Sequence, residues 1–132
     1  MTQYYLPLGT GMGTFDPVYR IHEPDNLLAV RYFNHAHNDP VEWILEGGIP
    51  AAMLLLAAVA WWLLKSVRAW RSPSPDKSLA RVGSGILLLV LVASVTDYPA
   101  RTPMIMAVAV IAAVWLNIGD YRARSKPETA RP

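Results

Sequence analysis

One short polar stretch, residues 34–39, holds the side chains best suited to chemistry in this chain. It reads Asn-His-Ala-His-Asn-Asp and runs directly into Pro40. Three interpretations are open: a polar turn that caps the following helix, a metal site made by His35, His37 and Asp39, or an acid–base histidine beside a helix N-terminus. Imidazole is readily poised for proton transfer near neutral pH, and the positive end of a helix attracts anions such as phosphate.

Metal is the least supported of the three interpretations. Only one further histidine, His22, lies in this half of the chain, and the sequence contains no cysteine. Thiolate metal sites and disulfides are therefore excluded. We expect no metal and no cofactor, and we take His37 as the candidate catalytic residue.

A second polar cluster occupies residues 97–101, between two apolar runs. Ionisable groups at the edge of a bilayer favour a functional role, and the guanidinium of Arg101 could bind a phosphate through two parallel hydrogen bonds. The alternatives are a tight turn closed by an ion pair with Asp97, or an arginine whose side chain extends from the apolar region towards water.

A helix start separates the first cluster from the apolar part of the chain. The order Asp39, Pro40, Val41, Glu42 predicts Asp39 at the N-cap, Pro40 at the first helical position and Glu42 at the third. Glycines and a proline at residues 47–50 interrupt this short helix. We expect it to lie at a membrane interface.

Long uncharged runs indicate that apolar helices position these two polar clusters. Hydrophobic residues make up 53% of the 132 residues and charged residues only 17%, well below the roughly 25% charged of soluble domains. Residues 47–64, 82–96 and 102–119 contain no charged side chain. The first run would rise about 27 Å as a helix, close to the thickness of a hydrocarbon core. The predicted fold is an all-α membrane protein with three transmembrane helices.

Lysine and arginine predict the orientation of these helices. Five lie in residues 65–81 and four in the C-terminal tail, against two in residues 1–46 and one in residues 97–101. The positive-inside rule places the richer segments in the cytoplasm. The predicted organisation is an extracytoplasmic loop with a short helix from Pro40, three spans, two cytoplasmic basic segments and one outer turn: 1–46, 47–64, 65–81, 82–96, 97–101, 102–119 and 120–132. A net charge of +2 without a basic face gives no support for nucleic-acid binding.

Three separated motifs resemble the O-antigen ligase and polymerase family. Its outer-loop signature is a His-Asn pair, nine residues, a glycine, two residues and a second glycine. Here His37 and Asn38 form the pair, Gly48 matches the first glycine, and Ala51 stands where the second is expected. Residues 9–15 resemble the family's Gly-x-Gly-x-x-x-Phe entry to the same loop, and residues 97–103 its turn between the last two helices.

The resemblance implies an activity and a location. Family members are polytopic enzymes of the bacterial inner membrane that transfer a glycan from an undecaprenyl-diphosphate carrier to a sugar acceptor on the outer face, without metal or nucleotide. His37 then corresponds to the histidine thought to activate the acceptor hydroxyl. Asn38, Asp97 and Arg101 are the expected substrate contacts, Arg101 towards the diphosphate.

The resemblance covers only the C-terminal part of such an enzyme. We expect upstream helices of the same enzyme to be partners of this chain, together with the lipid bilayer, and we expect these 132 residues alone to be inactive. Ligase and polymerase remain equally open. The alternative is a small non-enzymatic membrane protein, or an inactive fragment, that associates with a larger membrane partner.

Overall fold

The computed structural model describes residues 2–23 and 36–124, with side chains described up to residue 118. Within these ranges the chain is helical and contains no strand, so the all-α prediction is confirmed. The elements in chain order are η1 (Thr2–Tyr5), α1 (Phe15–His22), α2 (Asp39–Arg71), η3 (Pro75–Lys77), α3 (Ser78–Thr96), η4 (Pro99–Arg101) and α4 (Pro103–Arg124). His35, part of the predicted polar cluster, lies outside the described residues.

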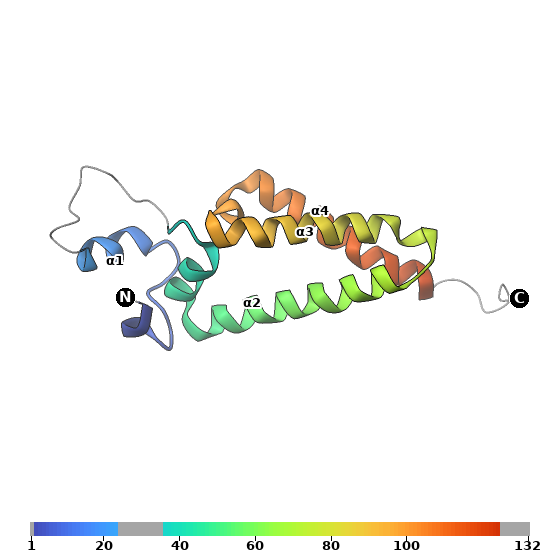
Figure 1. Cartoon of the computed structure of the whole chain (residues 1–132). Helices are drawn as coiled ribbons and strands as arrows, with labels where there is room; N and C mark the ends of the chain where they lie inside the picture. The colour runs from blue at the N-terminus through green and yellow to red at the C-terminus, as the bar shows by residue number, and fades with distance from the viewer. Residues whose placement is uncertain (1, 24–35, 125–132) are drawn as a thin grey trace, which may run out of the picture.

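Three long helices, α2, α3 and α4, run lengthwise along the molecule, and η1 and α1 lie at the end where α2 begins (Figure 1). The closest packing is between α3 and α4. Gly83 permits it, because a Cβ at this position would meet the Ala112 carbonyl oxygen and would lie 3.0 Å from the Leu116 amide nitrogen. Small residues allow helix backbones to approach in this way in membrane proteins.

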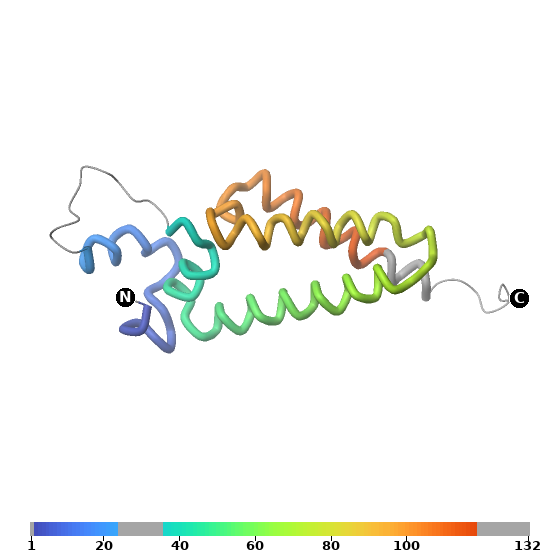
Figure 2. Tube along the Cα trace, viewed as in Figure 1, coloured from blue at the N-terminus to red at the C-terminus, as the bar shows by residue number. Residues whose placement is uncertain are grey.

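A sharp bend divides α2 near its start, as the trace in Figure 2 shows. Gly48 has φ 60° and ψ −149°, a conformation essentially restricted to glycine. Pro50 follows within the first turn of the second half, where a missing N–H is tolerated. The break predicted from residues 47–50 therefore exists, although it is a bend within one helical element.

Two helices among the described residues are long and apolar enough to cross a membrane: Asp39–Arg71 and Pro75–Thr96. The segment Pro103–Ile118 is also apolar but shorter. Many large apolar side chains of α2, including Met53, Leu56 and Leu64, are exposed on the surface. Length, composition and exposure are those that a membrane-spanning helix would have. Three spans and their orientation remain predictions.

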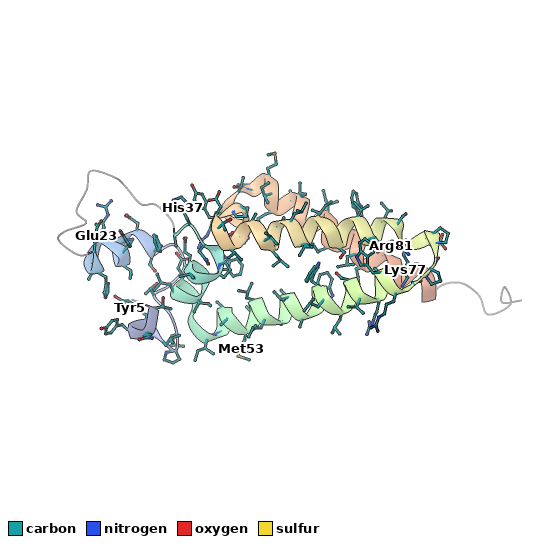
Figure 3. The ribbon with its side chains drawn as sticks, in the orientation of Figure 1. Tyr5, Glu23, His37, Met53, Lys77 and Arg81 are labelled. Carbon is teal, nitrogen blue, oxygen red and sulfur yellow. The ribbon has the colours of Figure 1, made fainter. Side chains whose placement is uncertain are left out.

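The basic segment 65–81, predicted as a loop, is largely helical, because α2 continues past Leu64 to Arg71. Arg81 closes the end of α2: its Nε donates to the Ala69 carbonyl at 3.2 Å and its Nη2 to the Ser72 carbonyl at 2.5 Å. Terminal carbonyls of a helix need such donors, and cations near a C-terminus are favourable. Figure 3 labels Arg81 at this end of the molecule, opposite His37.

Candidate functional site

The site at the opposite end centres on a buried ion cluster around Arg101. The Nη2 atom of Arg101 lies 2.9 Å from Glu42 Oε1 and 2.9 Å from Glu46 Oε2. Both glutamate side chains are 0% exposed, and that of Arg101 is 25% exposed. Carboxylates withdrawn from water in this way need a cation and hydrogen bonds, and Arg101 in η4 supplies the cation.

Helical spacing brings a third carboxylate to the same place. Asp39, Glu42 and Glu46 recur at intervals of three and four residues, so they share one face of α2. Asp39 is buried, and its Oδ2 accepts a hydrogen bond from the Ala100 amide at 3.0 Å. The start of α2 is therefore joined to η4 by both an ion pair and a backbone contact.

The electrostatics of Arg101 reflect this setting. Burial alone would lower the pKa of its guanidinium, but the hydrogen bond to Glu46 and the charges of Glu42, Glu46 and Asp39 outweigh that effect and raise the pKa above its ordinary value. Arg101 therefore stays a cation throughout the working pH range. Asp39 Oδ1 and Arg101 Nε are buried without a hydrogen-bond partner in the described part of the chain.

The N-terminal loop, residues 6–14 between η1 and α1, closes the cluster from the other side. The amides of Gly13 and Phe15 donate to Glu46 Oε1 at 2.9 and 3.3 Å. With both oxygens in use, the Glu46 carboxylate connects residues from the N-terminal loop, α2 and η4. Each of these segments carries one of the three motifs that resemble the family.

The bend in α2 explains why this loop binds where it does. A broken helix leaves carbonyl and amide groups without partners, and such groups must be paired elsewhere. The Thr10 amide donates to the Leu45 carbonyl at 3.0 Å, the Gly11 amide to the Glu46 carbonyl at 2.8 Å, and the Ile49 amide to the Pro7 carbonyl at 2.8 Å. The loop thus takes up the hydrogen bonds that the bend releases.

His37 lies at the surface of this assembly. Its side chain is 62% exposed, and its Nδ1 is 3.6 Å from Asp97 Oδ1. Its ring centroid is 5.2 Å from that of Tyr98, with the planes tilted by 48°. The two polar clusters of the sequence therefore meet here. The Asp97 carboxylate lies on the Nδ1 side of the His37 ring, which leaves Nε2 on the far side of the imidazole.

Asn38 caps α2, so the prediction that Asp39 is the N-cap is wrong by one residue. The Asn38 Oδ1 accepts from the Val41 amide at 3.0 Å, and its Nδ2 donates to the Val95 carbonyl at 2.8 Å. Asparagine and aspartate are about equally good caps, so the sequence alone did not distinguish the two. Asp39 is turned towards Ala100 instead.

The predicted site residues therefore separate into two groups. His37 and Asp97 lie together at the surface, whereas Asn38 and Arg101 hold segments of the chain together. A substrate contact for Asn38, Asp97 or Arg101 stays a prediction. Among the described residues, no group of three or more His, Asp or Glu side chains could hold a metal ion.

Sequence reasoning missed the burial of Glu42 and Glu46. The sequence predicts a short helix at a membrane interface here and gives no partner for either carboxylate. A usable signal existed: an acidic stripe at the start of a membrane helix requires a cation, and Arg101 is the basic residue of the outer turn. Matching the negative charge of Glu42 and Glu46 with the positive charge of the outer turn would have paired these glutamates with Arg101.

Comparison with known proteins adds no family assignment. Neither the models of protein families, nor the curated proteins, nor the solved structures contain a match to this chain. The resemblance therefore rests on the three motifs alone.

Proposed function

We propose that this chain is the C-terminal portion of a membrane glycan ligase or polymerase of the bacterial inner membrane. Such an enzyme transfers glycan from an undecaprenyl-diphosphate carrier to a sugar acceptor, as in O-antigen or exopolysaccharide assembly. The observation that carries the proposal is the Glu46 carboxylate, which bonds Gly13 and Phe15 of the first motif and Arg101 of the third from within the second. Motifs that merely coincide in sequence have no reason to meet at one buried group.

The proposed topology places this site outside the cell. α2, α3 and α4 each cross the membrane, with the basic segments 65–81 and 120–132 in the cytoplasm, as the lysine and arginine distribution favours. His37 and the 97–101 turn then lie together on the outer face. That is the side on which a flipped lipid-linked glycan is available.

In the proposed reaction His37 acts as the general base. It takes the proton from the acceptor hydroxyl as the oxygen attacks the anomeric carbon from the face opposite the leaving group. The new glycosidic C–O bond forms as the bond to the carrier diphosphate breaks, and the electron pair leaves with the diphosphate, which inverts the anomeric configuration. Asp97 stabilises the imidazolium that results.

Positive charge must stabilise the leaving diphosphate. The Nη2 atom of Arg101 already contacts two glutamates. The predicted contact with the diphosphate would therefore use the quarter of the Arg101 side chain that is exposed. Further cations would come from upstream helices of the enzyme. In this proposal the first task of Arg101 is to hold the motifs in place.

Complementation tests this function. The chain, encoded together with its upstream genomic sequence, is expressed in cells that lack their own O-antigen ligase or polymerase, and surface glycan is measured. We expect transfer to be restored, to fall with Asp97→Asn and to persist with Asp76→Asn, a matched change at the opposite end. Absence of glycan despite membrane insertion would favour the alternative, a non-enzymatic membrane protein with a larger partner, which the exposed apolar surface of α2 also suits.

A further inference from the structure

The N-terminal loop presents apolar side chains that no packing in the described chain explains. Leu8 is 76% exposed and Met12 70%, and Leu6 is also exposed. The first charged residue of the sequence is Asp16, so residues 1–15 carry no charged side chain. An uncharged segment with several exposed large apolar groups is unusual on a water-facing loop.

The loop is also fixed at a defined level of the molecule. Its backbone bonds to Leu45, Glu46 and Ile49 hold it against the bend of α2. Gly9 and Gly48 approach so closely that a Cβ on either would collide with the opposite backbone. The uncharged part of α2 begins immediately after this point. The loop therefore lies where the proposed span meets the membrane surface.

The exposed apolar surface of the loop continues onto α2. Ile49 and Met53, one turn apart, are both exposed on the helix just beyond the bend. Figure 3 shows Met53 directed away from α3 and α4. A surface of this kind, continuous with the apolar face of a spanning helix, fits the acyl region of a bilayer.

We propose that residues 6–12 form a lipid anchor, inserting Leu6, Leu8 and Met12 into the leaflet that surrounds the start of α2. The anchor holds the buried ion cluster around Arg101 at the lipid–water boundary. It also keeps the His37 surface at a fixed height above the membrane, where a lipid-linked substrate presents its diphosphate. The lipid contact rests on the membrane placement of α2 and does not depend on glycan transfer or on orientation.

Nitroxide labels at single cysteines test the anchor, because the native chain has no cysteine. Leu8→Cys and Met12→Cys are made in the full chain, with Gln3→Cys on η1 as the exposed polar control. Each labelled protein is placed in nanodiscs of phosphatidylethanolamine and phosphatidylglycerol, which leave both membrane faces open to reagents. Power-saturation spectroscopy then compares the collision rates of each label with oxygen, which concentrates in lipid, and with a water-soluble nickel chelate.

We expect the ratio of oxygen to nickel accessibility to be clearly higher at Leu8 and Met12 than at Gln3. Both side chains are exposed, so the substitutions leave the loop's backbone bonds intact. Nickel accessibility at Leu8 and Met12 as high as at Gln3 would overturn the proposal, since the loop would then lie in water. Low accessibility to both reagents at Leu8 and Met12 would overturn it too, by showing a protein contact such as a second copy of the chain.

Discussion

The Arg101 guanidinium donates to Glu46 at 2.9 Å across 55 positions of sequence, and the same Glu46 carboxylate accepts the Gly13 amide. This one side chain ties the N-terminal loop, the start of α2 and the turn before α4 together. Because the cluster is buried, its members depend on one another for charge and hydrogen bonds.

Removing the cation should destabilise the protein strongly. Arg101→Ala leaves Glu42 and Glu46 buried without a counter-charge, and breaking a buried pair in this way costs about 3–5 kcal/mol. The matched control is Arg20→Ala, which removes an exposed pair with Asp16 worth about 0–1 kcal/mol. Thermal unfolding in detergent, followed by tryptophan fluorescence, should show a large drop in melting temperature for the first variant only. Similar melting temperatures would contradict the buried cluster.

The raised pKa of Arg101 predicts a pH signature for Arg101→Lys. A group whose pKa is raised on folding contributes stability below its ordinary pKa and loses it only as pH rises through the raised value. For Arg101 that loss lies at a pH above the ordinary pKa of a guanidinium, far outside the range in which the protein is handled. Lysine, with an ordinary pKa of about 10.4, loses its charge sooner. The gap in melting temperature between the native protein and Arg101→Lys should therefore widen from neutral to alkaline pH, and a constant gap would argue against a charge effect.

Glycine substitutions should act in opposite directions at two positions. Gly48→Ala meets the backbone of Pro7 and Leu8 and forces alanine into a glycine-only conformation, at a cost of about 1–3 kcal/mol. Gly85→Ala in α3 meets nothing within 4 Å and should stabilise the helix by about 0.5–1 kcal/mol. Melting temperatures of both variants check the signs. Tolerance of Gly48→Ala would show that the bend is not fixed by the loop.

The proposed orientation can be tested by cysteine labelling in intact cells. Gln3→Cys and Asp76→Cys place single thiols at exposed positions near opposite ends of the long helices. A membrane-impermeant maleimide should label the first variant, and the second only after the membrane is permeabilised. The reverse pattern would place the basic segment 65–81 outside.

The sequence was most informative where local physics decides the outcome. Uncharged runs predicted the long apolar helices, and the glycines and proline of residues 47–50 predicted a break. The cap was displaced by one residue because Asn38 and Asp39 are equally suited to it. The ion cluster was not predicted, because Glu42 and Glu46 resemble an exposed polar face in the sequence. Only the fold brings Arg101, which is far along the chain, beside them.

Glycan transfer by a His37 variant tests the central claim most directly. Transfer is measured in membranes of cells that lack their own ligase or polymerase, using the complete enzyme that contains this chain, with expression checked by blot. His37 is exposed and lies outside α2, so His37→Ala should leave folding intact while lowering the transfer rate by about 10²–10⁴-fold. His22→Ala, at a histidine packed between Tyr4 and Tyr5, is the matched control and should retain transfer. Full activity of His37→Ala would contradict the catalytic assignment.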